Sequence, residues 1–169
     1  MHNHFTEILL ALTDAGVEYV VGGGVAAVLH GVERVTMDLD IAVNMTDSNL
    51  DRFAVAVSHL GLRPRAPVST DVLRNPESVR MLVEEKHALV FSFIDPDKPL
   101  RYLDVFLTQD LSYAVLKQDA VPIELEERRV WIVSASRLLA LKKAIRPPRD
   151  KDILDIRALE KILKDEKDS

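Results

Sequence analysis

The spacing of apolar residues along this chain switches between a helical and a strand-like period, which predicts a mixed fold of helices and strands. Helical spacing is found over residues 1–16, 24–30, 47–60, 76–86, 111–118, 134–144 and 150–164. Short apolar runs predict strands over residues 18–21, 38–43, 88–94, 102–107, 122–125 and 129–133. Turns at 95–99 and 126–128 join the last four strands into two hairpins. Residues 62–75 read as irregular, and the acidic tail from Asp165 is expected to be disordered.

The stretch between the first two strands combines a glycine turn with two acids. Three glycines, Gly22 to Gly24, follow the first strand and precede a helix, where free backbone N–H groups favour an anion. Asp38 and Asp40 are two positions apart on the second strand, so their side chains are predicted to point to the same face. One segment therefore offers both a phosphate cradle and a pair of oxygen ligands.

A third acid, Asp104, lies within an apolar run that predicts an ordinary strand. Asp104 is flanked by Leu103 and Val105 within an apolar run. A charge in such surroundings is costly unless it is paired or binds a cation. Three carboxylates with no cysteine in the chain suit Mg²⁺ or Mn²⁺, which prefer oxygen ligands. The alternative, a domain with coincidental acids, does not explain Asp104.

Composition limits the classes of protein that the chain can belong to. Its 169 residues, of which 47% are hydrophobic, predict a single domain over 1–169, with a core over about 17–133 and a C-terminal helical part over about 134–164. The net charge of −5 argues against a general nucleic-acid coat protein. No run of apolar residues approaches the length of a membrane span, so we expect a cytoplasmic protein without a membrane partner.

The motifs around the glycine turn resemble those of the nucleotidyltransferases of the DNA polymerase beta superfamily. That signature is a Gly-Gly or Gly-Ser pair, roughly ten residues, then Asp-x-Asp or Asp-x-Glu, and a third acid on a later strand. The sequence motifs are most similar to those of the small bacterial branch that includes AbiEii-type toxins and lincosamide adenylyltransferases. Its first motif is matched by Gly23, Gly24, Ala26, His30, Gly31, Arg34, Thr36, Asp38 and Asp40, and its C-terminal motif by Ala140, Leu141, Lys142, Lys151, Asp152 and Asp155. The resemblance spans about residues 18–157, and the third glycine, Gly22, departs from it.

The resemblance implies an α+β nucleotidyltransferase fold, in which a mixed sheet is flanked by helices and followed by C-terminal helices. It implies an enzyme that transfers a nucleoside monophosphate from an NTP, with ATP expected, to a hydroxyl, releasing pyrophosphate. Asp38 and Asp40 would hold Mg²⁺ or Mn²⁺, and Asp104 would complete the second metal site or accept a proton. The expected nucleotide-binding residues are Gly23, Gly24, Arg34, Thr36, Lys142 and Lys151. For Lys142, plain solvation on a helix is an equal alternative.

Other functions on the same fold stay open at this point. The acceptor of the nucleotide can be a small molecule, a protein side chain or an RNA end, and the acidic balance favours the first two. The chain can instead be a toxin–antitoxin component with a cognate partner. A third reading is a catalytically silent module that binds a partner.

Overall fold

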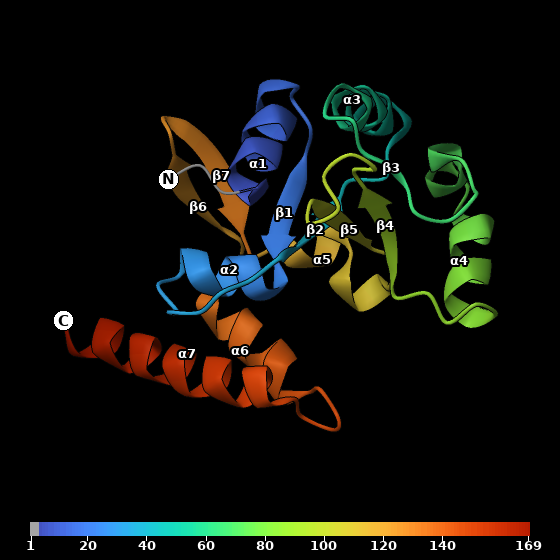
Figure 1. The fold of residues 1–169 in the computed structure, drawn as a ribbon. Helices are drawn as coiled ribbons and strands as arrows, with labels where there is room; N and C mark the ends of the chain where they lie inside the picture. The colour runs from blue at the N-terminus through green and yellow to red at the C-terminus, as the bar shows by residue number, and fades with distance from the viewer. Residues whose placement is uncertain (1–3) are drawn as a thin grey trace.

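The computed structural model describes residues 4–169 and contains one seven-stranded mixed sheet with helices around it (Figure 1). The strands are β1 (Tyr19–Gly22), β2 (Asp38–Val43), β3 (Arg63–Pro64), β4 (Val90–Ile94), β5 (Tyr102–Phe106), β6 (Val121–Leu125) and β7 (Arg128–Ile132). Their order across the sheet is β3-β4-β5-β2-β1-β7-β6. The central pair β2 and β5 is parallel, and β1 runs antiparallel to β2. Both predicted hairpins are present, as β4–β5 and β6–β7.

The helices are α1 (His4–Asp14), α2 (Gly23–Leu29), α3 (Asp47–His59), α4 (Pro76–Glu84), α5 (Tyr113–Leu116), α6 (Ala135–Lys143) and α7 (Asp150–Asp168). Two 3₁₀ turns, η1 (Thr70–Arg74) and η2 (Gln109–Leu111), complete the set. The first three residues of the predicted N-terminal helix lie outside the described residues. No helix in the described part of the chain is long and apolar enough to cross a membrane.

Alternation along the central strands separates a core face from a polar face. Leu39 and Ile41 on β2 are almost fully buried on one face, as are Leu103 and Val105 on β5. Helices α1 and α3 contribute to the same core, which includes Ile8, Leu9, Leu12, Leu50 and Phe53. The opposite face of β2 and β5 is left for the acids.

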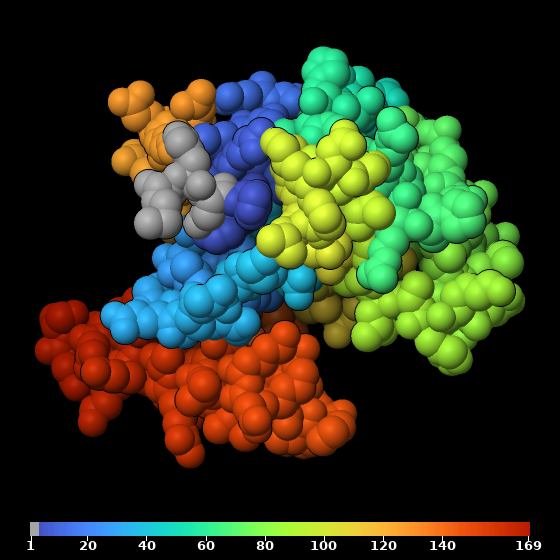
Figure 2. All heavy atoms as spheres, viewed as in Figure 1, coloured from blue at the N-terminus to red at the C-terminus, as the bar shows by residue number. Residues whose placement is uncertain are grey.

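The C-terminal helices form a layer of their own at one end of the central strands. Helices α6 and α7 pack against each other, and α6 also contacts α2. Figure 2 shows these helices, in orange and red, beneath the light-blue segment that links α2 to β2. A site between the strand ends and this helical layer is therefore framed by both parts of the chain.

Three local predictions need correction. The tail from Asp165 is helical up to Asp168, as a continuation of α7. The irregular stretch 62–75 contains the short strand β3 and the turn η1. The single helix predicted over 111–118 is shorter, because Ser112 caps α5 by accepting a hydrogen bond from the Val115 N–H and separates α5 from η2.

Candidate active site

The register of the parallel central strands places the three acids together. Asp40 on β2 lies directly opposite Asp104 on β5, and Asp38 lies opposite Tyr102. Because side chains alternate along a strand, Asp38, Asp40 and Asp104 share one face of the sheet. The prediction that Asp38 and Asp40 share a face therefore agrees with the register.

Burial and mutual repulsion raise the pKa of two of these acids. Burial is the larger cause of the raised pKa of Asp40, about 6, and the charges of Asp104 and Asp38 add to it. Lys151 and Lys142 oppose this rise. Burial also raises the pKa of Asp104, although a hydrogen bond with Ser92 acts against it. The cluster thus carries negative charge that nearby lysines only partly compensate.

The raised pKa of Asp40 predicts a pH-dependent difference in folding stability between the wild type and Asp40→Asn. In the unfolded chain Asp40 ionises near its ordinary pKa of 3.8, but in the folded protein only near 6. The folded state therefore loses stability relative to the variant as the pH rises from 4 to 6, by up to about 3 kcal/mol. Chemical denaturation of both proteins between pH 4 and pH 8 measures this difference. A constant difference across that range would contradict the cause given for the raised pKa.

The glycine turn allows the backbone to approach the side chains of the site. Gly22 ends β1, and Gly23 begins α2 with a φ of +58°, a conformation that suits glycine. A Cβ atom on Gly23 would overlap the Oδ2 atom of Asp40, and one on Gly24 would lie 2.7 Å from the hydroxyl oxygen of Thr36. Gly23 and Gly24 are thus the glycines that face the site, whereas a Cβ on Gly22 would meet the ring of Phe106.

We expect Gly23→Ala to displace the Asp40 carboxylate, and Gly31→Ala serves as a matched control. Both glycines have a positive φ, but a Cβ on Gly31 has open space around it. Each change costs on the order of 1 kcal/mol in backbone strain. Only Gly23→Ala is expected also to impair metal-dependent nucleotide binding, measured by calorimetry. Equal binding by the two variants would show that the close approach to Asp40 does not matter.

Two fully buried acids on α7 hold three cations on the side of the site opposite the sheet. Oδ2 of Asp155 accepts from Arg34 at 2.5 Å and lies 2.7 Å from Nζ of Lys142. Oδ2 of Asp152 accepts from Nε of Arg149 at 2.6 Å. Asp152 and Asp155 have exposed fractions of 0% and 1%. Lys142 is itself buried, so the alternative of plain solvation on a helix is wrong.

The acids and the cations line one cleft of about 730 Å³, which we call the main cleft. All nine residues predicted for the site line it, namely Gly23, Gly24, Arg34, Thr36, Asp38, Asp40, Asp104, Lys142 and Lys151. The acids come from the sheet and most of the cations from the C-terminal helices. Such a cleft has the charges to hold a polyanion on one side and a metal cation on the other.

The donor set suits a hard cation, but the protein does not supply a complete site. Among residues 4–169, no three acidic or histidine side chains are grouped closely enough to hold a metal ion by themselves. Mg²⁺ is commonly bound by one or two carboxylates together with substrate phosphates and water. Asp40 and Asp104, with Asp38 beside them, fit that partial role.

The fold of this chain is similar to solved structures of other proteins. No protein-family model matches the chain, and no curated protein matches it. The lincomycin-bound crystal structure of the lincosamide antibiotic adenylyltransferase LnuA is similar, with a TM-score of 0.64 and 14% identity over 96% of this chain and 98% of that one. ANT(2")-Ia in complex with adenylyl-2"-tobramycin has a TM-score of 0.59 and 18% identity over 96% of this chain and 89% of that one.

A third similar structure is an antigenic nucleotidyltransferase-like protein from Paracoccidioides brasiliensis, with a TM-score of 0.54. Its identity is 17%, over 92% of this chain and 74% of that one. This chain has the nucleotidyltransferase fold. The predicted fold class is therefore confirmed, including the mixed sheet and the C-terminal helices.

Sequence reasoning missed part of the cation-holding side of this nucleotidyltransferase fold. Arg149 lines the main cleft, and its partner Asp152 was matched only as a motif residue. Apolar character alone would assign Ile153 to the buried face of α7, but Ile153 is 38% exposed, whereas Asp152 and Asp155 are buried, as is Leu159. The available signal was their spacing, because positions 152, 155 and 159 fall on one face of a helix.

Proposed function

We propose that this protein is a metal-dependent nucleotidyltransferase. It moves a nucleoside monophosphate from an NTP, with ATP expected, to a hydroxyl group and releases pyrophosphate. One observation supports this most: three acids on the sheet face cations that buried acids hold on the C-terminal helices, across one cleft. The similar structures include a lincosamide antibiotic adenylyltransferase and a protein in complex with an adenylylated compound, adenylyl-2"-tobramycin.

The residues of the main cleft divide the work by charge. The backbone N–H groups of Gly23 and Gly24, with Thr36 and Arg34, bind the outer phosphates. Lys142 and Lys151 compensate the charge that develops on the leaving pyrophosphate. These roles need cations fixed in place, and the partners of Arg34 and Lys142 provide that.

Asp38, Asp40 and Asp104 are the residues that would hold Mg²⁺ or Mn²⁺ on the other side of the nucleotide. A bound divalent cation would lower the pKa of the attacking hydroxyl and compensate charge at the α-phosphate. Asp104 would either complete the second metal site or accept the proton of the hydroxyl. The oxygen then bonds to the α-phosphorus, and the bond from that phosphorus to the bridging oxygen of pyrophosphate breaks.

A small molecule is the acceptor class that we favour. Two of the similar structures contain lincomycin and adenylyl-2"-tobramycin. A catalytically silent module would be expected to have lost one of the acids, yet all three line the main cleft. No observation on this chain favours a cognate toxin or antitoxin.

Release of pyrophosphate from ATP tests the proposal. We expect release that depends on Mg²⁺ or Mn²⁺ and rises when a suitable hydroxyl compound is added. The control reaction replaces ATP by its analogue with a non-hydrolysable α,β linkage, which must give no pyrophosphate. Release that is unchanged when all divalent cations are chelated would contradict the metal-dependent mechanism.

A further inference from the structure

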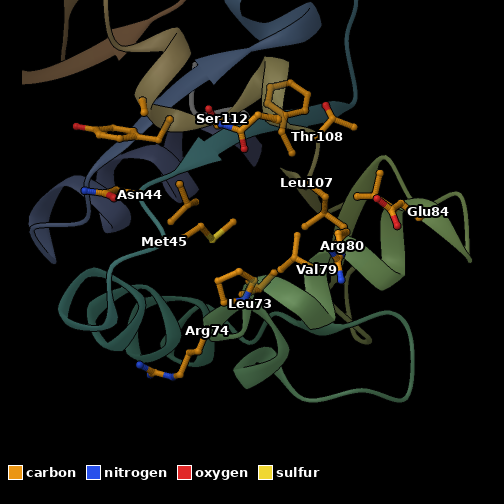
Figure 3. A pocket seen from close by; sticks show the side chains of 17 residues that line it. Asn44, Met45, Leu73, Arg74, Val79, Arg80, Glu84, Leu107, Thr108 and Ser112 are labelled. Atoms are coloured by element: carbon orange, nitrogen blue, oxygen red, sulfur yellow. The ribbon is translucent and has the colours of Figure 1, made fainter.

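A second cavity, of about 650 Å³, lies beside the main cleft and has a different character. It is bounded by the ends of β2 and β5, by α5, and by η1 and α4 (Figure 3). Its walls include Met45, Leu73, Val79, Val83 and Leu107. We call it the apolar cavity. Its volume is within the range of small-molecule sites in proteins.

Helix α4 forms one wall without being sealed into the core. None of its nine residues is fully buried. Val79 and Val83, one helical turn apart, line the apolar cavity and are only half-buried. Apolar side chains held at this depth gain free energy when a further apolar surface covers them. The wall is therefore suited to an apolar ligand.

The charged residues around the cavity give no preference for a charged ligand. Arg74 donates to Asp51 at 2.5 Å and to Asp71 at 3.1 Å, and Figure 3 shows its side chain turned away from the cavity. Arg80 and Glu84, of opposite charge, are both exposed on α4. An uncharged ligand is the simplest match.

Polar groups are placed at one end of the cavity, near the strand β5. Within residues 4–169, the side chains of Thr108 and Gln109 make no hydrogen bond, and both line the cavity. A few unpaired polar groups in a mostly apolar site can orient a ligand. These two side chains can therefore bind hydroxyl or carbonyl groups of a bound molecule.

One side chain belongs to both cavities. Phe106 lines the main cleft and the apolar cavity, and it is two positions from Asp104 on the same face of β5. The next residues divide between the two spaces, because Thr108 and Gln109 face the apolar cavity whereas Asp110 and Leu111 face the main cleft. The two cavities thus meet at Phe106, two positions along β5 from one of the acids.

We propose that the apolar cavity binds the body of the acceptor, an uncharged and largely apolar small molecule whose hydroxyl reaches the main cleft past Phe106. This inference rests on the proposed function and names the acceptor class. The hydroxyl oxygen bonds to the α-phosphorus, its proton passes to Asp104, and pyrophosphate leaves with the electron pair of the broken P–O bond.

The test uses 2-(naphthalen-2-yl)ethanol, a fluorescent, uncharged primary alcohol, as the probe. Val83→Lys places a charge in the apolar cavity, whereas Met81→Lys places one on the exposed side of the same helix, 53% exposed and outside the cavity. Val79→Trp, which fills the cavity without adding charge, is a second variant. Thermal melting of each protein establishes that it is folded.

We expect the probe to bind the wild type and Met81→Lys alike, and to bind Val83→Lys and Val79→Trp at least about tenfold more weakly. Labelled AMP should pass from ATP to the probe with the wild type and Met81→Lys. Absence of probe binding to the wild type, unchanged binding by both cavity variants, or a bound probe that receives no AMP would each overturn the inference.

Binding of ATP with Mg²⁺, measured on the same samples, separates this inference from the proposed function. The cavity variants leave the main cleft intact, so their affinity for ATP should equal that of the wild type. Failure of every protein to bind ATP refutes the proposed function itself. If ATP binds normally but the cavity variants bind the probe as well as the wild type does, only the assignment of the acceptor site is refuted.

Discussion

Removal of any one of the three acids is expected to abolish nucleotidyl transfer while leaving the protein folded. Asp38→Ala, Asp40→Ala and Asp104→Ala should each lower the rate of transfer by about a thousandfold or more, because in the proposed mechanism each removes charge that would hold the metal and the attacking hydroxyl. All three lie on one face of β2 and β5, as the proposed shared role requires. Pyrophosphate release from ATP measures the loss.

Replacement of Asp40 should lower the activity but raise the stability of the folded protein. Its ionised carboxylate is disfavoured in the folded state, so Asp40→Asn should unfold at a higher temperature than the wild type at pH 8 without metal. Loss of activity by misfolding is thereby distinguished from loss of a ligand. Asp110→Asn is a matched control, because Asp110 also lines the main cleft but belongs to η2 and not to the strands that carry the three acids. Near-normal transfer by any of the three alanine variants would refute the essential role of that acid.

The second large effect is expected on stability, from Asp155→Asn. Asp155 is buried and contacts both Arg34 and Lys142, whose side chains are 18% and 7% exposed. Removal of its charge leaves Arg34 without its acidic partner and Lys142 with only the more distant Asp152, at 3.7 Å. Loss of a buried partner of this kind costs about 3–5 kcal/mol. We expect a lower melting temperature and weaker ATP binding, because both cations line the side of the main cleft that we propose binds the nucleotide.

Glu160→Gln on the same helix provides the comparison. Glu160 pairs with Lys143 at 2.6 Å, but both side chains are about half exposed. Loss of an exposed pair of this kind costs less than about 1 kcal/mol. Urea denaturation of both variants measures the two values. Similar losses in Asp155→Asn and Glu160→Gln would show that the buried pairs do not organise the cations.

The strand pattern was sufficient to predict the acidic side of the site. Asp38 and Asp40 follow from strict alternation along one strand, and Asp104 from the presence of a charge in an apolar run. These are local signals. The register that sets Asp40 opposite Asp104 is a property of two strands distant in the sequence, and only the structure supplies it.

The cationic side could be predicted only in part, for a physical reason. An amphipathic pattern assigns apolar residues to the buried face of a helix, so it favours Ile153 over Asp152 and Asp155. Ion pairing reverses that choice, since Arg34 and Lys142 compensate the charge of Asp155 in the interior. The partner Arg34 is 121 residues away in the sequence, beyond the reach of any local pattern.

The apolar cavity could not be foreseen for a different reason. The sequence predicts the helix at Pro76, which Asn75 caps by accepting from the N–H groups of Glu77 and Ser78. It does not tell how deeply that helix packs. The half-buried state of Val79 and Val83 depends on how α4 is placed relative to η1 and to the loop after β5, which line the same cavity.

The most direct test of the central claim is calorimetric titration of the purified protein with each NTP, with and without Mg²⁺ or Mn²⁺, repeated on Asp38→Ala. We predict that at least one NTP, with ATP expected, binds the wild type only when the metal is present, and that Asp38→Ala loses this metal-dependent binding. Binding of no nucleotide by the wild type, or equal binding by the variant, would contradict the claim that the main cleft is a metal-dependent nucleotide site.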